Sequence, residues 1–464
     1  MLVVHPTLRY VLCAAGFVTV GIVSIVVFWP RNGVESASPS PTPPQTIADA
    51  RGESHEKDLP NTSVARATKS GNSPRHRSTR SYSEPWSCFR GPKYGVSPWA
   101  NVPVAWDGAS GQGVLWKTPL KTSCVGSPVL WRDRIFLTEA DENERAVLTF
   151  DAESGKELWR QAVADGGKGA PLPPVSDSAL AMPTPACDAN GVYVLFGTGD
   201  FAAFTHDGKL KWHVFLKRPE IGYGYASSPC VIDGLVCVQF DELNGGRVLA
   251  VAAATGKIEW EHPRSRGPSW SSPISVPGAD EKPLLVVNAN GSATAYDLTG
   301  QVVWDVDAAN GQVTPSPVWW DSRVYFVNVG SRLICYNVSG SPHKLWQLNG
   351  RLPDVASPVV VNGLFFMAAS GQLVCVDATT GTEVWTHKSP RCYASLVASG
   401  DRVYALGRDG TMLIVAAERT YRLVGTCSLG EGSDATPALG DGRIYIRGRN
   451  NLWCLGTNEK PTSR

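Results

Sequence analysis

The sequence predicts an all-β protein, an eight-bladed β-propeller whose blades are four-stranded antiparallel sheets. Three observations lead to this prediction. The chain of 464 residues repeats one pattern, as in FDAESGKELW at 150–159, YDLTGQVVW at 296–304 and VDATTGTEVW at 376–385. Gly (46), Pro (34) and Trp (16) are abundant and Met (4) is scarce, which favours short strands and tight turns. The chain is also longer than one ordinary compact core, which a repeat array accommodates.

Two landmarks count the repeats. The first is a Ser or Thr, followed by Pro in all but one case, that opens a short apolar strand: Ser127, Thr184, Ser228, Ser272, Ser316, Ser357, Ser395 and Thr436. Successive members are 38 to 57 residues apart, which is the period of four-stranded propeller blades. The second is a Trp that ends the unit, replaced once by Thr: Trp116, Trp159, Trp212, Trp260, Trp304, Trp346, Trp385 and Thr426. Both landmarks predict eight blades.

Each unit has the alternation of four strands joined by hairpins. After Ser357 the sequence reads PVVV, an Asn-Gly turn, LFFMA, a polar turn, QLVCVD, another turn and TEVW. The last unit ends near residue 456 without a fourth strand, whereas the strand around Trp116 precedes the first Ser-Pro step. We therefore expect the N-terminal strand to complete blade eight and close the ring, which leaves no exposed sheet edge.

The N-terminal region differs from the repeats. Residues 10–29 are twenty residues without a charge, and they lie between Arg9 and Arg31. A stretch of this length can cross a bilayer as one helix. This length favours a signal anchor, and a secretory signal peptide cleaved near residues 36–38 is the alternative. The predicted domains are a transmembrane signal anchor (1–30), a disordered Ser/Pro-rich linker (31–83), the propeller (84–457) and a disordered tail (458–464).

Charge and cysteines exclude several function classes. A net charge of +1 with 18% charged residues gives no field for nucleic acid, so we expect no nucleic-acid partner. The 11 cysteines form no CxxC or adjacent Cys-Cys pair, so no zinc, haem or redox motif is predicted. Cys230 and Cys237 flank an Asp-Gly turn symmetrically, which places them opposite each other in a hairpin, where a disulfide is possible but uncommon.

Aligning the repeats assigns structural roles to their best-marked residues. One third-strand position requires a small side chain, so Cys there acts as a small hydrophobe: Thr149, Ala203, Ala250, Ala295, Cys335, Cys375, Val415 and Cys454. The fourth-strand Trp is expected to pack between blades. Asp377 leads a turn ending in Gly and is expected to accept backbone N–H groups there. The Ser/Thr hydroxyls are expected to bond inner-strand backbone groups.

The longer loops, between strands two and three and between blades, share one face of a propeller, and such loops usually carry binding chemistry. Aromatic and charged residues lie near the channel mouth on that face. The candidate partner- or ligand-binding residues are Tyr225, Trp270, Tyr393, Asp354, Asp434 and Arg447. Ordinary packing at the rim is the alternative. The histidines have no metal-like or nucleophile-like spacing, so no catalytic or metal-binding residue is predicted.

The repeat resembles that of the pyrroloquinoline-quinone-like (PQQ-like) propeller family. The resemblance covers about residues 110–456 and is carried by units such as SPVVVNGLFFMAASGQLVCVDATTGTEVW, with the opening WSCFRGP and the closing GRIYIRGRNNLWCLG. One branch of that family comprises quinoprotein dehydrogenases, which hold PQQ and calcium. This chain lacks the adjacent cysteines often found there, and no calcium ligand set could be assigned. The other branch is similar to the outer-membrane β-barrel assembly lipoprotein, although a helical anchor is expected here instead of a lipidated Cys.

The resemblance implies a membrane-tethered, non-catalytic scaffold in the periplasm or another extracytoplasmic space. It would bind an unknown protein or polymer partner, with envelope or outer-membrane protein assembly as the expected process, and it would need no cofactor. A PQQ-dependent dehydrogenase, which would hold PQQ and calcium, is the first alternative. A glycan-binding module is the second, and it would depend on Trp270 or Tyr225.

Overall fold

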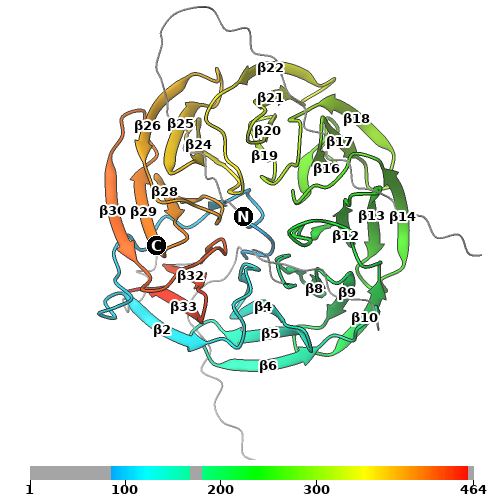
Figure 1. Ribbon diagram of the computed structural model, residues 1–464, viewed down its shortest axis with the longest axis horizontal. Helices are drawn as coiled ribbons and strands as arrows, with labels where there is room; N and C mark the ends of the chain where they lie inside the picture. Colours follow the sequence, from blue (N-terminus) through cyan, green and yellow to red (C-terminus); the bar gives the residue numbers. More distant parts are fainter. Residues whose placement is uncertain (1–84, 168–179, 441, 458–464) are drawn as a thin grey trace, which may run out of the picture. The chain divides into compact units, whose positions relative to one another are not determined.

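The computed structural model describes residues 85–167, 180–440 and 442–457. Their secondary structure consists of β-strands arranged as eight radial sheets around a central axis (Figure 1). The predicted eight-bladed propeller is therefore confirmed. No candidate for a membrane-spanning helix occurs within these ranges. The predicted anchor, the linker up to residue 83 and the C-terminal tail lie outside the described residues.

The strands run outward from the channel in chain order. Blades one and two contain β3 (Val129–Trp131), β4 (Arg134–Ala140), β5 (Arg145–Asp151), β6 (Glu157–Ala162), β7 (Ala186–Asp188), β8 (Gly191–Leu195), β9 (Asp200–Phe204) and β10 (Leu210–Phe215). Blades three and four contain β11 (Cys230–Ile232), β12 (Leu235–Phe240), β13 (Gly246–Ala252), β14 (Ile258–Arg264), β15 (Ile274–Pro277), β16 (Pro283–Ala289), β17 (Ser292–Tyr296) and β18 (Val302–Asp307).

The second half repeats this plan, with two additions from the N-terminal region. Blades five and six contain β19 (Val318–Trp320), β20 (Arg323–Val327), β21 (Leu333–Asn337), β22 (His343–Leu348), β23 (Val359–Val361), β24 (Leu364–Ala369), β25 (Gln372–Asp377) and β26 (Glu383–Lys388). Blades seven and eight contain β27 (Val397–Ser399), β28 (Arg402–Leu406), β29 (Thr411–Ala416), β30 (Leu423–Ser428), β31 (Ala438–Gly440), β32 (Arg443–Arg447), β33 (Asn451–Gly456), and the additions β1 (Val96–Ser97) and β2 (Val114–Pro119).

The ring closes as predicted. Strand β2 is the outermost strand of blade eight and pairs antiparallel with β33, with Trp116 opposite Cys454. The last blade is therefore built from both ends of the propeller sequence. This pairing satisfies the backbone of an otherwise open edge.

A ring of hydrogen bonds also closes around the channel. The backbone N–H of Ser127 donates to Thr184 Oγ1 at 3.1 Å, and the same bond repeats from the backbone N–H of each landmark residue to the landmark hydroxyl of the next blade. The last bond, from the N–H of Thr436 to Ser127 Oγ at 2.9 Å, completes the circle. The expectation that these hydroxyls satisfy inner-strand backbone groups is confirmed, and each one serves the preceding blade. We call these eight residues the hydroxyl ring.

The repeated Trp and Gly residues contact each other where neighbouring blades meet. Trp212 of blade two donates its Nε1–H to Ala253 O of blade three at 3.0 Å. A Cβ atom at Gly256 of blade three would lie 2.6 Å from the Trp212 ring. Equivalent Trp–Gly pairs join several other blades, so only glycine leaves room for the neighbouring indole. The predicted role of the fourth-strand Trp is confirmed.

Blade seven departs from the predicted alignment. Its register pairs Ile414 with Gly425, at the positions where blade six pairs Cys375 with Trp385. The sequence alignment, which placed Val415 and Thr426 there, was wrong by one residue. The alignment failed because this blade has no Trp to mark the position. A separate segment fills the space of the Trp: a Cβ atom at Gly425 would lie 2.6 Å from the carbonyl oxygen of Val104.

Residues 86–97, which we call the plug, cross the channel at the centre of the ring (Figure 1). Ser87 O accepts the backbone N–H of Cys187 in blade two at 2.8 Å. On the other side, the buried guanidinium of Arg90 donates to Pro317 O at 2.6 Å and to Pro358 O at 3.1 Å, which ties the plug to blades five and six. Its last two residues form β1, parallel to β27. The plug was not predicted from the sequence.

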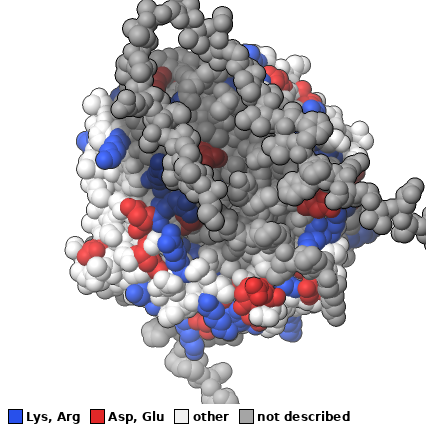
Figure 2. Space-filling view, in the orientation of Figure 1, with Lys and Arg blue, Asp and Glu red and all other residues white. Residues whose placement is uncertain are grey.

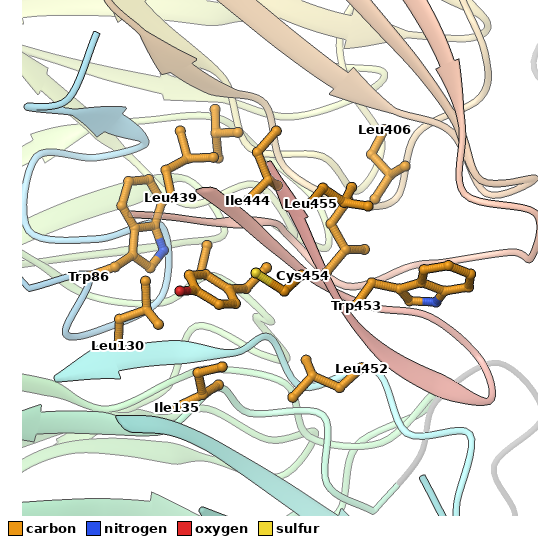
Figure 3. Packing of buried hydrophobic residues seen from close by; sticks show 14 of the residues in the cluster. Trp86, Leu130, Ile135, Leu406, Leu439, Ile444, Leu452, Trp453, Cys454 and Leu455 are labelled. Atoms are coloured by element: carbon orange, nitrogen blue, oxygen red, sulfur yellow. The ribbon is translucent and has the colours of Figure 1, made fainter. Parts of the chain in front are cut away.

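The N-terminal end of the plug is part of the core at the joint of blades eight and one. Trp86 lies beside Leu130 and Leu439 (Figure 3) and is almost completely buried. Its carbonyl oxygen accepts the backbone N–H of Leu130 at 2.8 Å. The plug is therefore an integral part of the propeller.

The cysteines behave as the alignment predicted. Cys335, Cys375 and Cys454 are buried opposite the fourth-strand Trp of their blades. Burial raises the pKa of the Cys375 thiol to about 12, so it stays neutral. Cys230 and Cys237 lie directly opposite each other in the β11–β12 hairpin. Both thiols are free in the structure, so the possible disulfide is not formed.

Candidate functional site

The candidate site is a cavity of about 890 Å³ at the channel mouth, which we call the well. All eight residues of the hydroxyl ring line it, and so does Phe89 of the plug. Because the plug crosses the channel beyond the ring, the well opens only toward the loop face. Its size lies within the range of about 300–1,000 Å³ typical of small-molecule sites.

Four of the six predicted site residues line the well: Trp270, Tyr393, Asp354 and Asp434. The other two are held inside the protein. Tyr225 is 1% exposed and donates its hydroxyl to Gln239 O at 2.7 Å. Arg447 is also 1% exposed, and Nη1 donates to Thr138 O at 2.6 Å across the joint of blades eight and one. These two side chains present no surface to a partner.

Arg447 belongs to a buried ion network. Its charge lies 4.0 Å from the carboxylate of Glu139, which also forms a 2.7 Å salt bridge with Arg160. Burial is the main factor that lowers the pKa of Arg447, and the nearby Glu139 counteracts it. A sequence pattern cannot distinguish such an arginine from a surface one, because both occupy a strand end near the channel.

The charges at the well are largely paired with one another. Arg408 forms a bidentate pair with Asp434 at 2.8 and 3.0 Å and lies 3.7 Å from the ring centre of Tyr393. Arg332 donates to Asp307 at 2.6 Å. Asp354 lines the same cavity and has no ion pair or hydrogen-bond partner among the described residues. Basic and acidic side chains are also interspersed over the described surface in view in Figure 2.

One wall of the well is rich in amides. It is formed by blades four and five and contains Asn310, Gln312, Asn328, Gln347 and Asn349. Asn328 is buried, and its Nδ2 donates to Asn310 O at 2.7 Å. Its Oδ1 is buried with no partner among the described residues, so an acceptor at the well is left unused.

Sequence reasoning missed Tyr223. Its side chain is 65% exposed and lines the well, with its ring 6.2 Å from that of Trp270 in an edge-on arrangement. Its backbone has φ +62°, a left-handed conformation that non-glycine residues rarely adopt. The flanking Gly222 and Gly224 were the available signal, because a bulky residue between two glycines marks an unusual turn.

The described residues contain no group of three or more His, Cys, Asp or Glu side chains able to hold a metal ion. The histidines have structural neighbours. His206 stacks on Trp131 with ring centres 5.8 Å apart, and burial is the main cause that lowers its pKa. His213 lies 3.1 Å from the buried carboxylate of Asp200, which also accepts the hydroxyl of Thr198.

The sequence matches the family described as outer membrane protein assembly factor BamB over residues 100–241, 147–357 and 244–460. The chain belongs to this family. BamB of Shewanella oneidensis is 23% identical over 295 residues, which are 61% of this chain and 61% of that protein, so the match spans less than two thirds of the relative. BamB of Burkholderia pseudomallei is 23% identical over 379 residues, covering 75% of this chain and 88% of the relative.

Solved structures share the fold. BamB from Moraxella catarrhalis superposes with a TM-score of 0.57 at 13% identity, covering 75% of this chain and 99% of that one. Quinohemoprotein alcohol dehydrogenase from Comamonas testosteroni also gives 0.57 at 13% identity, covering 83% of each chain. The BamB family and the dehydrogenases therefore share one architecture, and the difference in function must come from the site.

Proposed function

We propose that this protein is a non-catalytic scaffold that binds a protein partner through its loop face outside the cytoplasm. By analogy with its BamB relatives, the process would be assembly of outer-membrane proteins. The segment at 10–29 would tether the propeller to a membrane.

Exposed apolar side chains on the loop face carry this proposal. Tyr223, Leu243 and Val329 are 65%, 56% and 42% exposed, and they lie on loops at the channel-mouth end of blades three and five. Apolar groups on loops that are held by a rigid scaffold are typical of partner-binding surfaces. Each loop connects two strands of the closed ring, which hold the loop in a defined position for a partner.

The dehydrogenase alternative fits the residues less well. Calcium prefers several oxygen ligands, including carboxylates. The well contains two carboxylates, and one of them, Asp434, is already bound on both oxygens by Arg408. The remaining carboxylate, Asp354, has no second acidic residue lining the well that is free to join it. The well thus offers calcium one carboxylate that is not already paired, which favours the scaffold over the dehydrogenase.

Photocrosslinking in native membranes tests the scaffold proposal. A photocrosslinking residue at position 243 is expected to capture one protein partner. Position 423 provides the control, because Leu423 is similarly exposed but lies on the outer strand β30. Capture at 423 and not at 243 would place the partner on the outer edge of the ring and contradict the proposal.

Titration with PQQ and calcium tests the alternative. We expect neither a change in quinone absorbance nor a thermal shift of the full-length protein. A saturable shift that depends on Asp354 would show instead that the well holds the cofactor.

A further inference from the structure

We propose that the well binds the end of a neutral oligosaccharide. This goes beyond the proposed function, which assigns a protein partner to the exposed loops and no ligand to the interior of the well. Four properties of the well lead to a saccharide: unused donors, unused acceptors, aromatic faces and paired charges.

The donors are the protons of the hydroxyl ring. Each ring oxygen accepts a backbone N–H from the preceding blade, so the hydroxyl proton is what remains to donate. None of the eight protons has a hydrogen-bond acceptor among the described residues, although all eight residues line the well and are at least nine-tenths buried. Buried donors without acceptors are costly, which makes them suitable for a ligand rich in oxygen.

The acceptors lie on the wall above the ring. Asn328 Oδ1 is buried without a partner, and the carboxylate of Asp354 has none among the described residues. Both can accept a hydroxyl proton from a ligand. A molecule that fills the well must therefore offer donors and acceptors together, as the hydroxyl groups of a sugar do.

Aromatic rings supply the apolar part of the site. Trp270 and Tyr223 line one side of the well, and Tyr393 lines another. Trp270 is fixed by the bond from its Nε1 to Gly224 O at 2.8 Å. A pyranose ring has an apolar C–H face that can pack on such a ring, which complements the polar floor and wall.

The charge balance selects a neutral ligand. Arg408 is neutralised by Asp434, and Arg332 is paired with Asp307. An anionic ligand would meet the carboxylate of Asp354 without gaining an unpaired cation among the described residues that line the well.

Because the plug closes the far end of the channel, the ligand enters the well from the loop face with one end and does not pass through the channel.

Isothermal titration of the full-length protein tests this inference with three neutral probes: cellotetraose, maltotetraose and chitotetraose. We expect at least one to bind saturably. Asn328→Leu and Asp354→Leu should each weaken that binding by about tenfold, as expected when a hydrogen-bond acceptor for the ligand is lost. Asn244→Leu, on the same face but outside the well, should bind as the wild type does.

Thermal melts of each variant check folding, and Asp354 is exposed, so Asp354→Leu keeps the test valid if Asn328→Leu unfolds. The inference is overturned if no probe binds, if both well variants bind as tightly as the wild type, or if a short peptide with a free carboxylate binds and the saccharides do not. Crosslinking at position 243 is scored separately, so the partner proposal can fail or succeed independently.

Discussion

In five blades, the glycine of the turn between the third and fourth strands lies against the Trp of the preceding blade: Gly155, Gly208, Gly256, Gly300 and Gly381. At Gly256 two demands coincide: φ is +73°, and the Trp212 ring fills the space where a side chain would begin. Gly234, in the β11–β12 hairpin of the same blade, has a similar φ of +82° but faces open space. Comparing substitutions at these two glycines therefore distinguishes the cost of backbone strain from the cost of disturbing the contact between blades.

We therefore predict that Gly256→Ala destabilises the protein more than Gly234→Ala. The left-handed backbone costs alanine about 1 kcal/mol at either position. The clash with Trp212 should add about 1–3 kcal/mol at Gly256 alone. Urea unfolding of both variants measures the difference. Equal losses would show that the Trp–Gly contact contributes nothing to the blade interface.

The turn at Asp377 confirms the predicted role of this residue. Its Oδ1 accepts the N–H groups of Thr379 and Thr380, both at 2.9 Å, and its Oδ2 pairs with Arg419 of blade seven at 2.7 Å. The bond to Arg419, followed by those backbone N–H groups, holds the pKa of Asp377 below its ordinary value of 3.8. Asn337 makes the same turn contact in blade five, with 3.1 Å between its Oδ1 and the N of Ser339.

This gives a prediction with a defined sign. Because the folded pKa is lowered, Asp377 stabilises the protein above the unfolded pKa, and the contribution is lost as pH falls through the folded value. Asp377→Asn keeps the turn acceptor, so its cost at pH 7 should be below about 1 kcal/mol. Between pH 7 and about pH 3 the variant should lose less stability than the wild type. A larger acid loss in the variant, measured by urea unfolding at both pH values, would contradict this.

At the scale of elements, the segment around Trp106 replaces the missing Trp of blade seven. Trp106 is buried in the cluster shared by blades seven, eight and one. The carbonyl oxygen of Val104 accepts a hydrogen bond from the Cys427 thiol at 3.4 Å, and the N–H of Gly108 donates to Ser428 O at 2.8 Å. The segment therefore covers the outer strand of this blade.

We predict that Trp106→Ala lowers the free energy of unfolding by roughly 3–5 kcal/mol, as expected for removal of a buried aromatic side chain. Leu423→Ala, on the exposed face of β30 in the same blade, should cost less than about 0.5 kcal/mol. Chemical denaturation measures both. A small effect at Trp106 would mean that blade seven needs no substitute for its missing Trp.

At the scale of the whole molecule, the hydroxyl ring couples all eight blades. Ser272 Oγ accepts the N–H of Ser228 at 2.9 Å, so one side chain satisfies the backbone of the preceding blade. Ring closure by β2 and the circle of hydroxyls act at opposite edges of the blades, one outside and one at the channel. Together they fix the geometry of the loop face.

Ser272→Ala is expected to destabilise the protein by about 1–3 kcal/mol, because a buried N–H loses its acceptor. Ser272→Thr should cost less than about 1 kcal/mol, because threonine occupies this position at Thr184 and Thr436. Thermal unfolding compares the two variants. Equal effects would indicate that volume matters at this position and hydrogen bonding does not.

The candidate site was predictable in part. Trp270, Tyr393, Asp354 and Asp434 were found because position in the repeat places them at the channel mouth. Tyr225 lies two residues from Tyr223, yet it is buried while its neighbour is exposed. The left-handed backbone at Tyr223 turns the chain there, and no repeat comparison reveals that turn.

The sequence by itself determined the number of blades, the strand order within them and the closure by the N-terminal strand. These features depend on local alternation and on a period that recurs eight times, and each repeat confirms the others. Only the tertiary structure decided the plug, the substitute segment of blade seven and the burial of Arg447. Each of these arises from one non-repeated segment or side chain meeting distant blades, and such contacts leave no periodic signal in the chain.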